Sequence, residues 1–424
     1  MIAWLLLTFA VCIILRFPIA FALGLSCLVF LLATGTPLII MPMKMYSGID
    51  VFVLLSIPGF ILAGNLMNYG GLTEKIIAFC NHLVGHIRGG LALANIAASM
   101  LFAGISGTAI SDTASIGSVM IPAMKKEGYD AEFACAVTAS SSTVGPIIPP
   151  SVSMIIAATL TGLSVGKLFL AGAIPGTLLG LSLLGYTYYV SRKRQYPKHA
   201  RSSWRQIRRG FLDTFWALLM TVIILYGIIG GFFTPTEASI VAVLYALVIG
   251  IFVYRKLTFR RAIVVVLDSM RTSASLMVLI GFANLFGYLL IVEELPQIVS
   301  NQILTFSDNP YVVLLLINLL LIFVGTFMET IAALLILFPI LLKVALAVGI
   351  DPIHFSVIAL LNLMIGLTTP PLGVCLFVAA GIGKVSIGAV SRAGFPFLLV
   401  SLIVLALVTL LPELSLFLPK LLLD

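Results

Sequence analysis

Apolar runs recur along the whole chain, and most are roughly 20 residues long, which is the length that crosses a bilayer as a helix. Short polar or charged stretches separate them. The pattern lacks the alternating segments of about 10 residues that mark a membrane β-barrel. It therefore predicts an all-α polytopic membrane protein. Residues 1–20 have no positively charged start and no A-x-A site, so we interpret them as a first span and not as a cleaved signal.

Four of the apolar segments are interrupted at their centres. Segments 91–122 and 311–342 carry GISGTAISDTASIG and VGTFMETIA, and each has both ends on one side of the membrane by its flanking charges, which predicts a re-entrant helical hairpin. Segments 131–161 and 352–380 carry SSSTVGPIIPPS and NLMIGLTTPPLG, which predicts two broken helices. Such backbone is stable at membrane depth only where it is buried in protein or lines water.

Composition agrees with lipid as the solvent, since 61% of residues are hydrophobic and 9% are charged. The net charge of +8 has a local source in residues 191–209, a stretch with eight Lys or Arg and no acid. Nucleic-acid binding is one reading of such a stretch. The positive-inside rule gives a better one, a cytoplasmic loop. Counting spans outward from this loop leaves the C-terminus periplasmic, and we expect the N-terminus there too.

The two halves of the chain, 1–190 and 211–424, share landmarks and are joined by a basic connector, 191–210. Four pairs of landmarks recur at offsets of 217 to 222 residues: Pro18 and Pro235, Gly59 and Gly281, Asp112 and Glu329, and Pro149-Pro150 and Pro370-Pro371. The charge argument gives the halves opposite orientations. The sequence therefore predicts two inverted-topology repeats, an arrangement typical of secondary transporters.

The interruptions are where we expect the chemistry. A proline removes an N–H and frees a carbonyl one turn upstream, and carbonyl and hydroxyl oxygens suit a hard cation such as Na⁺. We predict two sodium sites, each built from one hairpin tip and the break that follows it. The first site comprises Ser106, Gly107, Thr108, Gly145 and Pro146, and the second comprises Gly325, Thr326, Gly366, Thr368 and Thr369. For a single serine, packing between helices would be the simpler interpretation.

An anionic substrate would meet few cations, because Arg16 and Lys44 look interfacial and no Lys or Arg occupies a midplane position. We therefore assign substrate binding to helix dipoles, hydroxyls and amides. The residues assigned to substrate are Ser140, Ser141, Ser142, Pro149, Asn362 and Pro370. Asp112 and Glu329 follow Gly turns, so they either cap a helix or take part in coupling.

Other chemistry has little support in the sequence. The five cysteines are scattered through apolar segments, and the four histidines form no ligand pair; His82 and His86 are expected in a cytoplasmic loop. We expect sodium as the only metal and no cofactor. An intramembrane enzyme would need a catalytic pair at depth, such as Ser with His, and none is present, so we expect no enzymatic activity.

These motifs also resemble the large membrane subunit of tripartite ATP-independent periplasmic (TRAP) transporters, the M or DctM-like family. The stretches that carry the resemblance are FPIAFALG (17–24), IPGFILAGNLMNYGGLTEKI (57–76), LFAGISGTAISDTASIGSVMIPAMKKEGYD (101–130), FACAVTASSSTVGPIIPPS (133–151), GFFTPTEAS (231–239) and GLTTPPLGVCLFVAAGIG (366–383). The sequence departs from the family's usual pattern at SGTAISDTA and IPGF, without losing a polar group.

The resemblance implies a Na⁺-coupled importer of organic acids in the bacterial or archaeal inner membrane. Its partners would be a small four-helix Q (DctQ-like) membrane subunit and a periplasmic P (DctP-like) binding protein, and family substrates include C4-dicarboxylates, sialic acid and sugar acids. The mechanism would be of the elevator type. The hairpins and broken helices would move as a transport domain against a scaffold of helices in 1–84 and 211–306.

Two other transport readings stay open from the residues. A self-sufficient Na⁺/dicarboxylate carrier of similar architecture would need no binding protein, and a neighbouring gene for a small four-helix subunit would separate it from the tripartite system. A channel fits less well than a carrier, since paired hairpin tips suit occlusion better than an open pore.

Overall fold

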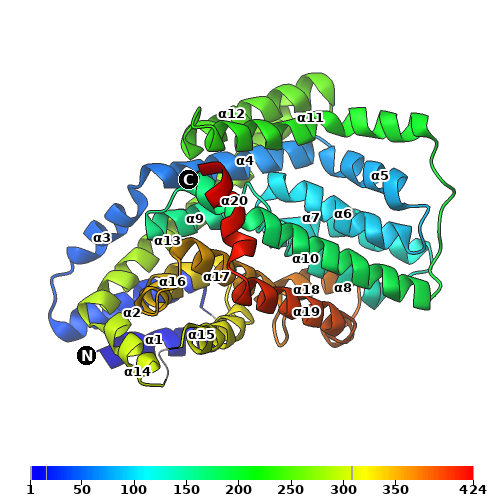
Figure 1. Cartoon of the computed structure of the whole chain (residues 1–424). Coiled ribbons are helices and arrows are strands. Elements are labelled where there is room, and N and C mark those ends of the chain that lie inside the picture. Colours follow the sequence, from blue (N-terminus) through cyan, green and yellow to red (C-terminus); the bar gives the residue numbers. More distant parts are fainter. Residues whose placement is uncertain (1, 16, 307–308, 424) are drawn as a thin grey trace.

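The fold is known from a computed structural model, which describes residues 2–15, 17–306 and 309–423 and leaves the side chains of 104–106, 300–301 and 303–306 undescribed. Helices and their connections account for all of the described residues, and no strand occurs among them. The bundle is elongated, with the long helix α10 running along it (Figure 1). The all-α prediction is confirmed.

The first half of the chain runs from α1 to α10. Its elements are α1 (Ile2–Ile14), α2 (Ile19–Thr34), α3 (Ile40–Ile49), the 3-10 turn η1 (Phe52–Leu55), α4 (Ser56–Tyr69), α5 (Leu72–Val84), α6 (Gly90–Ser106), α7 (Ala109–Lys126), α8 (Ala131–Ser142), α9 (Val152–Thr161) and α10 (Val165–Lys193). Both interrupted segments of this half form two helices each, α6 with α7 and α8 with α9. Each pair is separated at the predicted interruption.

The second half of the chain runs from α11 to α20. It comprises α11 (Trp204–Ile229), α12 (Pro235–Val248), the π-helical turn η2 (Ile249–Val253), α13 (Phe259–Val292), α14 (Leu295–Phe306), α15 (Pro310–Gly325), α16 (Thr330–Ala347), α17 (Pro352–Gly366), α18 (Val374–Gly383), α19 (Ile387–Leu410) and α20 (Glu413–Leu423). Helices α7 and α16 have 18 residues each, and α9 and α18 have 10 each. The second elements of the two hairpins and of the two broken helices therefore match in length.

Seven helical stretches of the described chain are long and apolar enough to cross a bilayer. They cover residues 52–69, 165–193, 204–229, 235–253, 259–292, 330–347 and 387–410. Helix α1 is shorter than the predicted first span: it has 13 residues, and a straight helix of that length rises about 20 Å. The chain bends between α1 and α2 at Pro18, which precedes the first residue of α2.

Local sequence explains where many helices begin. Side chains at the N-caps of α9, α10, α11, α12 and α13 accept backbone N–H groups: Ser151, Ser164, Ser203, Thr234 and Thr258. Thr234 and Glu237 form a reciprocal capping box at the start of α12. These caps place the helix ends within one or two residues of the Gly, Pro and Ser/Thr signals in the sequence.

Four boundaries differ from the sequence prediction. The apolar run before Glu293 predicts a span over 272–291, but helix α13 begins 13 residues earlier, since charged residues in its first turns still favour helix. The connector 191–210 is helical at both ends, leaving residues 194–203 as the nonhelical part. His82 lies in the last turn of α5 and not in a loop. The last apolar run predicts a span over 385–411, and a further helix, α20, follows it and packs on α10.

The interrupted segments of the two halves pack against each other. Helix α18 packs on α7 and α8, and α9 packs on α16. Lys125 in the last turn of α7 donates from Nζ to the carbonyl of Gly383 at the end of α18, at 2.7 Å. Each hairpin therefore contacts the second segment of the other half's broken helix, so the four interrupted segments form one cluster.

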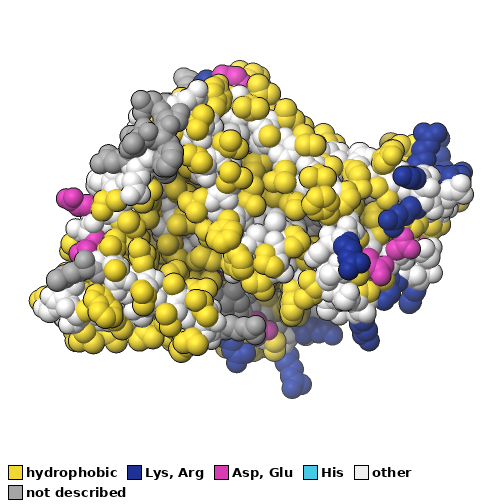
Figure 2. Space-filling view, turned by 90° about the horizontal axis from the view of Figure 1, so that it is seen from below, with side chains coloured by type: hydrophobic (Ala, Val, Ile, Leu, Met, Phe, Trp, Pro, Cys, Tyr) yellow, Lys and Arg dark blue, Asp and Glu magenta, His cyan; other side chains and the backbone are white. Residues whose placement is uncertain are grey.

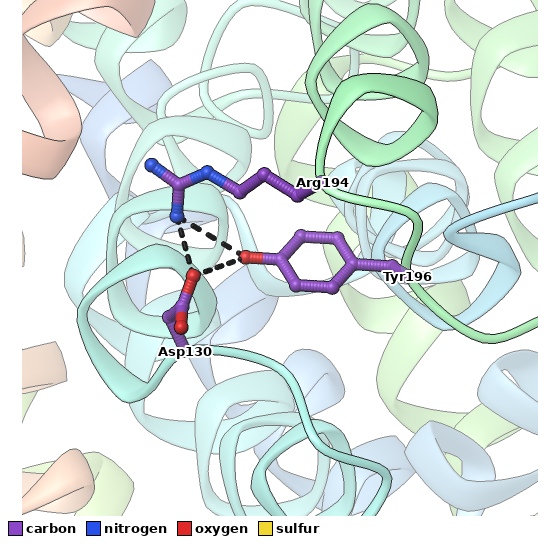
Figure 3. A network of polar contacts seen from close by, with 3 residues as sticks. All are labelled: Asp130, Arg194 and Tyr196. Atoms are coloured by element: carbon purple, nitrogen blue, oxygen red, sulfur yellow. Dashed lines mark hydrogen bonds and ion pairs between the residues drawn. The ribbon is translucent and has the colours of Figure 1, made fainter.

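One end of the molecule carries the basic connector. Figure 2 shows Lys and Arg side chains gathered mainly at that end, while hydrophobic side chains dominate the rest of the face. There Arg194 Nη1 and the Tyr196 hydroxyl both donate to Asp130 Oδ2, at 2.5 and 2.6 Å (Figure 3). The backbone N–H of His199 also donates to the Gly85 carbonyl at 2.9 Å. We call this the basic end of the molecule.

The remaining helices are tied to one another by polar contacts of their own. Lys256 Nζ bonds Glu74, Lys75 Nζ lies 3.9 Å from Asp213 Oδ1, and Asn65 Nδ2 donates to Ser269 Oγ at 2.9 Å. These contacts join α4 and α5 to α11 and α13 and to the loop before α13. Helices α4, α5, α11 and α13 therefore form a connected group.

Candidate functional site

The first hairpin tip and the first break meet at Gly145. A Cβ added to Gly145 would clash with Asp112 Oδ2, so the carboxylate of α7 lies directly against the backbone of the break. Asp112 is fully buried in the first turn of α7. Gly107 lies on the other side of the tip, where an added Cβ would be 3.2 Å from Val152 Cγ2 at the start of α9. The hairpin tip therefore contacts both the break and the start of α9.

The second hairpin tip and the second break make the corresponding contact through backbone alone. An added Cβ on Gly366 would lie 2.6 Å from the Gly325 Cα, and one on Gly325 would lie 3.1 Å from the Gly366 Cα. Two glycines are needed here because any side chain would separate the tip from the break. The structure thus brings together Gly325 and Gly366, two of the residues predicted for the second site.

Prolines stand at the same place in both breaks. The residue four positions after Gly145 is Pro149 and the one four positions after Gly366 is Pro370, so neither carbonyl can accept the usual N–H of a continuing helix. The Gly366 carbonyl instead accepts the N–H of Thr369 at 3.0 Å. The next carbonyl in each break is used to close it. Ser151 Oγ donates to Pro146 O at 2.5 Å, and the Cys375 N–H donates to Leu367 O at 3.1 Å. Both Pro-Pro peptide bonds, 149–150 and 370–371, are cis.

Hydroxyl groups surround the second contact with their protons already engaged. Thr326 Oγ1 donates to Phe323 O at 2.7 Å, while Thr368 Oγ1 and Thr369 Oγ1 both donate to Ile365 O at 2.9 Å. A hydroxyl that donates its proton backwards along the helix presents its oxygen lone pairs outward. Such oxygens can ligate a cation but cannot donate to an anion.

The two acids have different positions. Glu329 is the N-cap of α16, and its carboxylate accepts the N–H groups of Ile331 and Ala332 at 3.0 and 3.3 Å. Thr108 holds the N-cap position of α7, so Asp112 lies four residues further along its helix than Glu329 does. The sequence match between Asp112 and Glu329 is therefore out of register with the helix starts. Glu329 is a helix cap, whereas Asp112 faces the first break.

The candidate substrate residues of the first break are enclosed. Ser140, Ser141, Ser142 and Pro149 are buried. Ser99 Oγ of α6 bonds Ser141 Oγ at 2.9 Å, and Ser142 Oγ donates to Thr138 O at 2.8 Å. In this conformation these hydroxyls tie the break to its own hairpin.

The second break is open at its apex, where Pro370 and Leu372 are exposed. Asn362 is buried before the break, and its Nδ2 donates to the carbonyl and the Oδ1 of Asn318, at 3.0 and 2.7 Å. Its amide hydrogens are therefore engaged within the hairpin cluster, while its Oδ1 accepts no bond. The two breaks differ in exposure even though their backbones correspond.

Some predicted chemistry falls outside these observations. The side chain of Ser106 lies outside the described residues, although α6 extends to it. No group of three His, Cys, Asp or Glu that could hold a metal occurs in the described chain. All five cysteines are buried and unpaired by disulfides. Sequence reasoning missed that Asp112 would contact Gly145, because the signal for it lies in the packing of α7 on α8.

Comparison with known proteins identifies the family. The family model described as "Tripartite ATP-independent periplasmic transporter, DctM component" matches residues 6–414. The chain is 44% identical to the sialic acid TRAP transporter large permease protein SiaM of Vibrio cholerae, over 99% of this chain and 97% of SiaM. It is 40% identical to the C4-dicarboxylate TRAP transporter large permease protein DctM of Pseudomonas aeruginosa, over 94% of each chain.

A solved structure shares the fold. The YdaH transporter of Alcanivorax borkumensis superimposes with a TM-score of 0.62 at 15% identity, over 87% of this chain and 86% of YdaH. At that identity the likeness concerns the fold alone. The family model and the two relatives carry the assignment, and they extend over nearly the whole chain. The chain therefore belongs to the DctM family, the large permease subunits of tripartite ATP-independent periplasmic transporters.

Proposed function

We propose that this protein is the permease subunit of a Na⁺-coupled secondary transporter that imports an organic acid anion. The observation that carries the proposal is the pair of contacts between hairpin tips and breaks, Asp112 with Gly145 and Gly325 with Gly366. At each contact a proline removes the usual helical N–H donor, so the Gly145 and Gly366 carbonyls keep a lone pair for an ion even though the Gly366 carbonyl also accepts the Thr369 N–H. Oxygen ligands of this kind suit a hard cation, and two such sites would hold two ions.

The two sites differ in charge, so each would bind its ion in a different way. The first has the carboxylate of Asp112 beside the Gly145 backbone, whereas the second has neutral oxygens from Thr326, Thr368 and Thr369. Hard cations prefer carboxylate oxygens, so Na⁺ would bind against Asp112 at the first site. The second site would hold its ion more weakly, through carbonyl and hydroxyl dipoles alone.

The relatives support a proposal for the substrate class. Sialic acid and C4-dicarboxylates, the substrates in the names of the two relatives, are both carboxylates. We infer that this chain transports an anion of that class. A periplasmic binding protein and a small membrane subunit would act with it, since the family is tripartite. The protein would reside in the inner membrane, with its basic end cytoplasmic and both termini periplasmic.

The polar contacts are consistent with an elevator. Ties such as Asn318 with Asn362 and Lys125 with Gly383 lie within the interrupted cluster, whereas Lys256 with Glu74 lies within the surrounding helices. Helices α10 and α19 pack on the cluster and would move with it. The cluster would then slide as one body, carrying its ions and substrate, along a scaffold of residues 1–84 and 211–306.

Uptake by proteoliposomes tests this function. The permease would be reconstituted with the small subunit and binding protein encoded beside it, and supplied with labelled sialic acid or succinate under an inward Na⁺ gradient. We expect uptake of one of them that stops when K⁺ replaces Na⁺ or when the binding protein is omitted. Equal uptake in Na⁺ and K⁺ would overturn the coupling, and uptake without the binding protein would favour the self-sufficient carrier.

A further inference from the structure

A cleft of about 430 Å³ lies at the end of the molecule opposite the basic end. In Figure 1, α3 at that end is far from the connector between α10 and α11. One wall of the cleft comes from α3 and α13, which belong to the proposed scaffold. The other comes from α9 and α16, which belong to the interrupted cluster. The polar lining residues are Lys44, Ser47, Asn284, Tyr288 and Thr159.

Lys44 is the cation of this cleft, and it is held in place. Its Nζ lies 4.0 Å from the centre of the Tyr288 ring, within the range of a cation–π contact. Its backbone carbonyl accepts from Asn284 Nδ2 at 2.8 Å, which ties α3 to α13. The side chain is half-buried, so its ammonium group is partly removed from water.

No acid of the described chain balances the charge of Lys44. The lining contains no Asp or Glu, and no carboxylate of the described chain lies within ion-pair distance of Lys44. The aromatic ring stabilises the ammonium without neutralising it. A cleft with one unneutralised cation, low-dielectric walls and few polar groups concentrates anions. An organic acid entering from the side of this cleft would meet Lys44 before it reaches the breaks.

We propose that this cleft is an anion-receiving subsite, in which the Lys44 ammonium binds a carboxylate of the transported acid between α3 and α9. The inference rests on the proposed function, because it takes an organic acid as the substrate and the end opposite the connector as periplasmic. It assigns to the scaffold a charged contact that the hydroxyls and carbonyls of the breaks do not provide. An anion bound here touches both walls, so it would be handed to the moving cluster.

An anionic lipid headgroup offers the same chemistry as a carboxylate, and the test separates the two. Thr159 lies on the wall opposite α3, and its hydroxyl bonds only within its own helix, to Ile155 O at 2.9 Å. A Thr159→Cys probe would therefore report the potential in the cleft. Background reaction is low since the native cysteines are buried.

The measurement is the rate at which the Thr159→Cys thiol reacts with an anionic reagent, sulfonatoethyl methanethiosulfonate, relative to a cationic one, trimethylammonioethyl methanethiosulfonate. We expect Lys44→Gln to lower the anion-to-cation rate ratio by about 5-fold, because it removes a unit charge from the cleft that the thiol faces. Lys44→Arg should keep the ratio. Lys420→Gln is the matched control, because Lys420 is exposed on α20 and pairs with Glu413 outside the cleft.

Protection identifies the occupant. Sialic acid or succinate should slow the anionic reagent with Lys44 present and not in the Lys44→Gln variant, in neutral and anionic vesicles alike. Protection by anionic vesicles alone would overturn the proposal in favour of a lipid. An anion-to-cation rate ratio that is the same with and without Lys44 would also overturn it. In uptake assays Lys44→Gln should raise KM several-fold with a smaller change in kcat. The rate ratio needs no Na⁺, so Na⁺-independent uptake would refute the proposed coupling without touching this subsite.

Discussion

Single residues decide whether each tip can reach its break. The Gly325 and Gly366 backbones touch, and the Asp112 carboxylate fills the place that a Cβ on Gly145 would need. The glycines and prolines of both breaks stand out in the sequence, and so does their spacing. The different roles of Glu329, which caps α16, and Asp112, which faces a break, do not stand out in the sequence. Both acids follow a Gly turn, and only the positions of the helix starts distinguish them.

Gly366→Ala should separate the second tip from its break. The new methyl would lie 2.6 Å from the Gly325 Cα, so backbone must move, at a cost of roughly 1–3 kcal/mol. We expect Na⁺-dependent uptake to fall at least about 10-fold. Gly381→Ala on α18 is the control, because nothing lies within 4 Å of its added Cβ. Equal uptake by the two variants, at matched expression, would contradict the contact's role.

Thr369→Ala should weaken the second ion site. Its hydroxyl proton is bonded to Ile365 O, so the substitution removes an outward oxygen and little structure. Losing one cation ligand should raise the Na⁺ concentration for half-maximal uptake by about 10-fold, equivalent to about 1.4 kcal/mol. Thr369→Ser keeps the oxygen and should restore the wild-type value. A Na⁺ titration of uptake that is the same for all three proteins would remove Thr369 from the site.

Tyr196 at the basic end offers a pH test. Burial, followed by its hydrogen bond to Asp130, raises the pKa of Tyr196 to about 12. The raised pKa means that its contribution to stability is complete below about pH 10 and disappears only as pH rises toward 12. Tyr196→Phe should lower the free energy of unfolding by about 1 kcal/mol, and the loss should be the same at pH 6 and pH 9. A loss of thermal stability that grows between those two pH values would contradict this account.

At the scale of elements, the sequence predicts the long apolar and the interrupted helices well. Their signals are local: hydrophobic runs, Gly or Pro at the breaks, and Ser/Thr caps. The helices it misses or shortens are amphipathic or charged, such as α20 and the first turns of α13. An apolar-run criterion stops at a charge, while helix propensity and tertiary packing do not.

A hydrogen bond between the two proposed bodies gives an element-scale test. Asn68 Nδ2 on α4 donates to Ser115 Oγ on α7 at 2.8 Å, so scaffold and cluster touch here. Sliding of the cluster must break this contact. A disulfide in the Asn68→Cys/Ser115→Cys double variant should abolish uptake under oxidation and release it under reduction. Each single variant is the control, and full uptake with the disulfide formed would rule out sliding at this boundary.

At the scale of the whole molecule, the crossed packing of α18 on α7 and of α9 on α16 brings the two sites into one body. The sequence contains the two halves and their matching landmarks. It does not contain the partner of each segment, since contacts between residues some two hundred positions apart leave no local pattern. No local pattern predicts the Lys44 cleft either, because its walls come from four helices of both halves.

The central claim is that ion and organic acid cross together. The most direct measurement is the flux of radioactive sodium into proteoliposomes that contain the permease and its small subunit, with no Na⁺ gradient and the loaded binding protein outside. Addition of the transported acid should drive sodium inward, and Gly366→Ala should abolish that flux. Entry of the acid with no accompanying sodium flux would contradict the account.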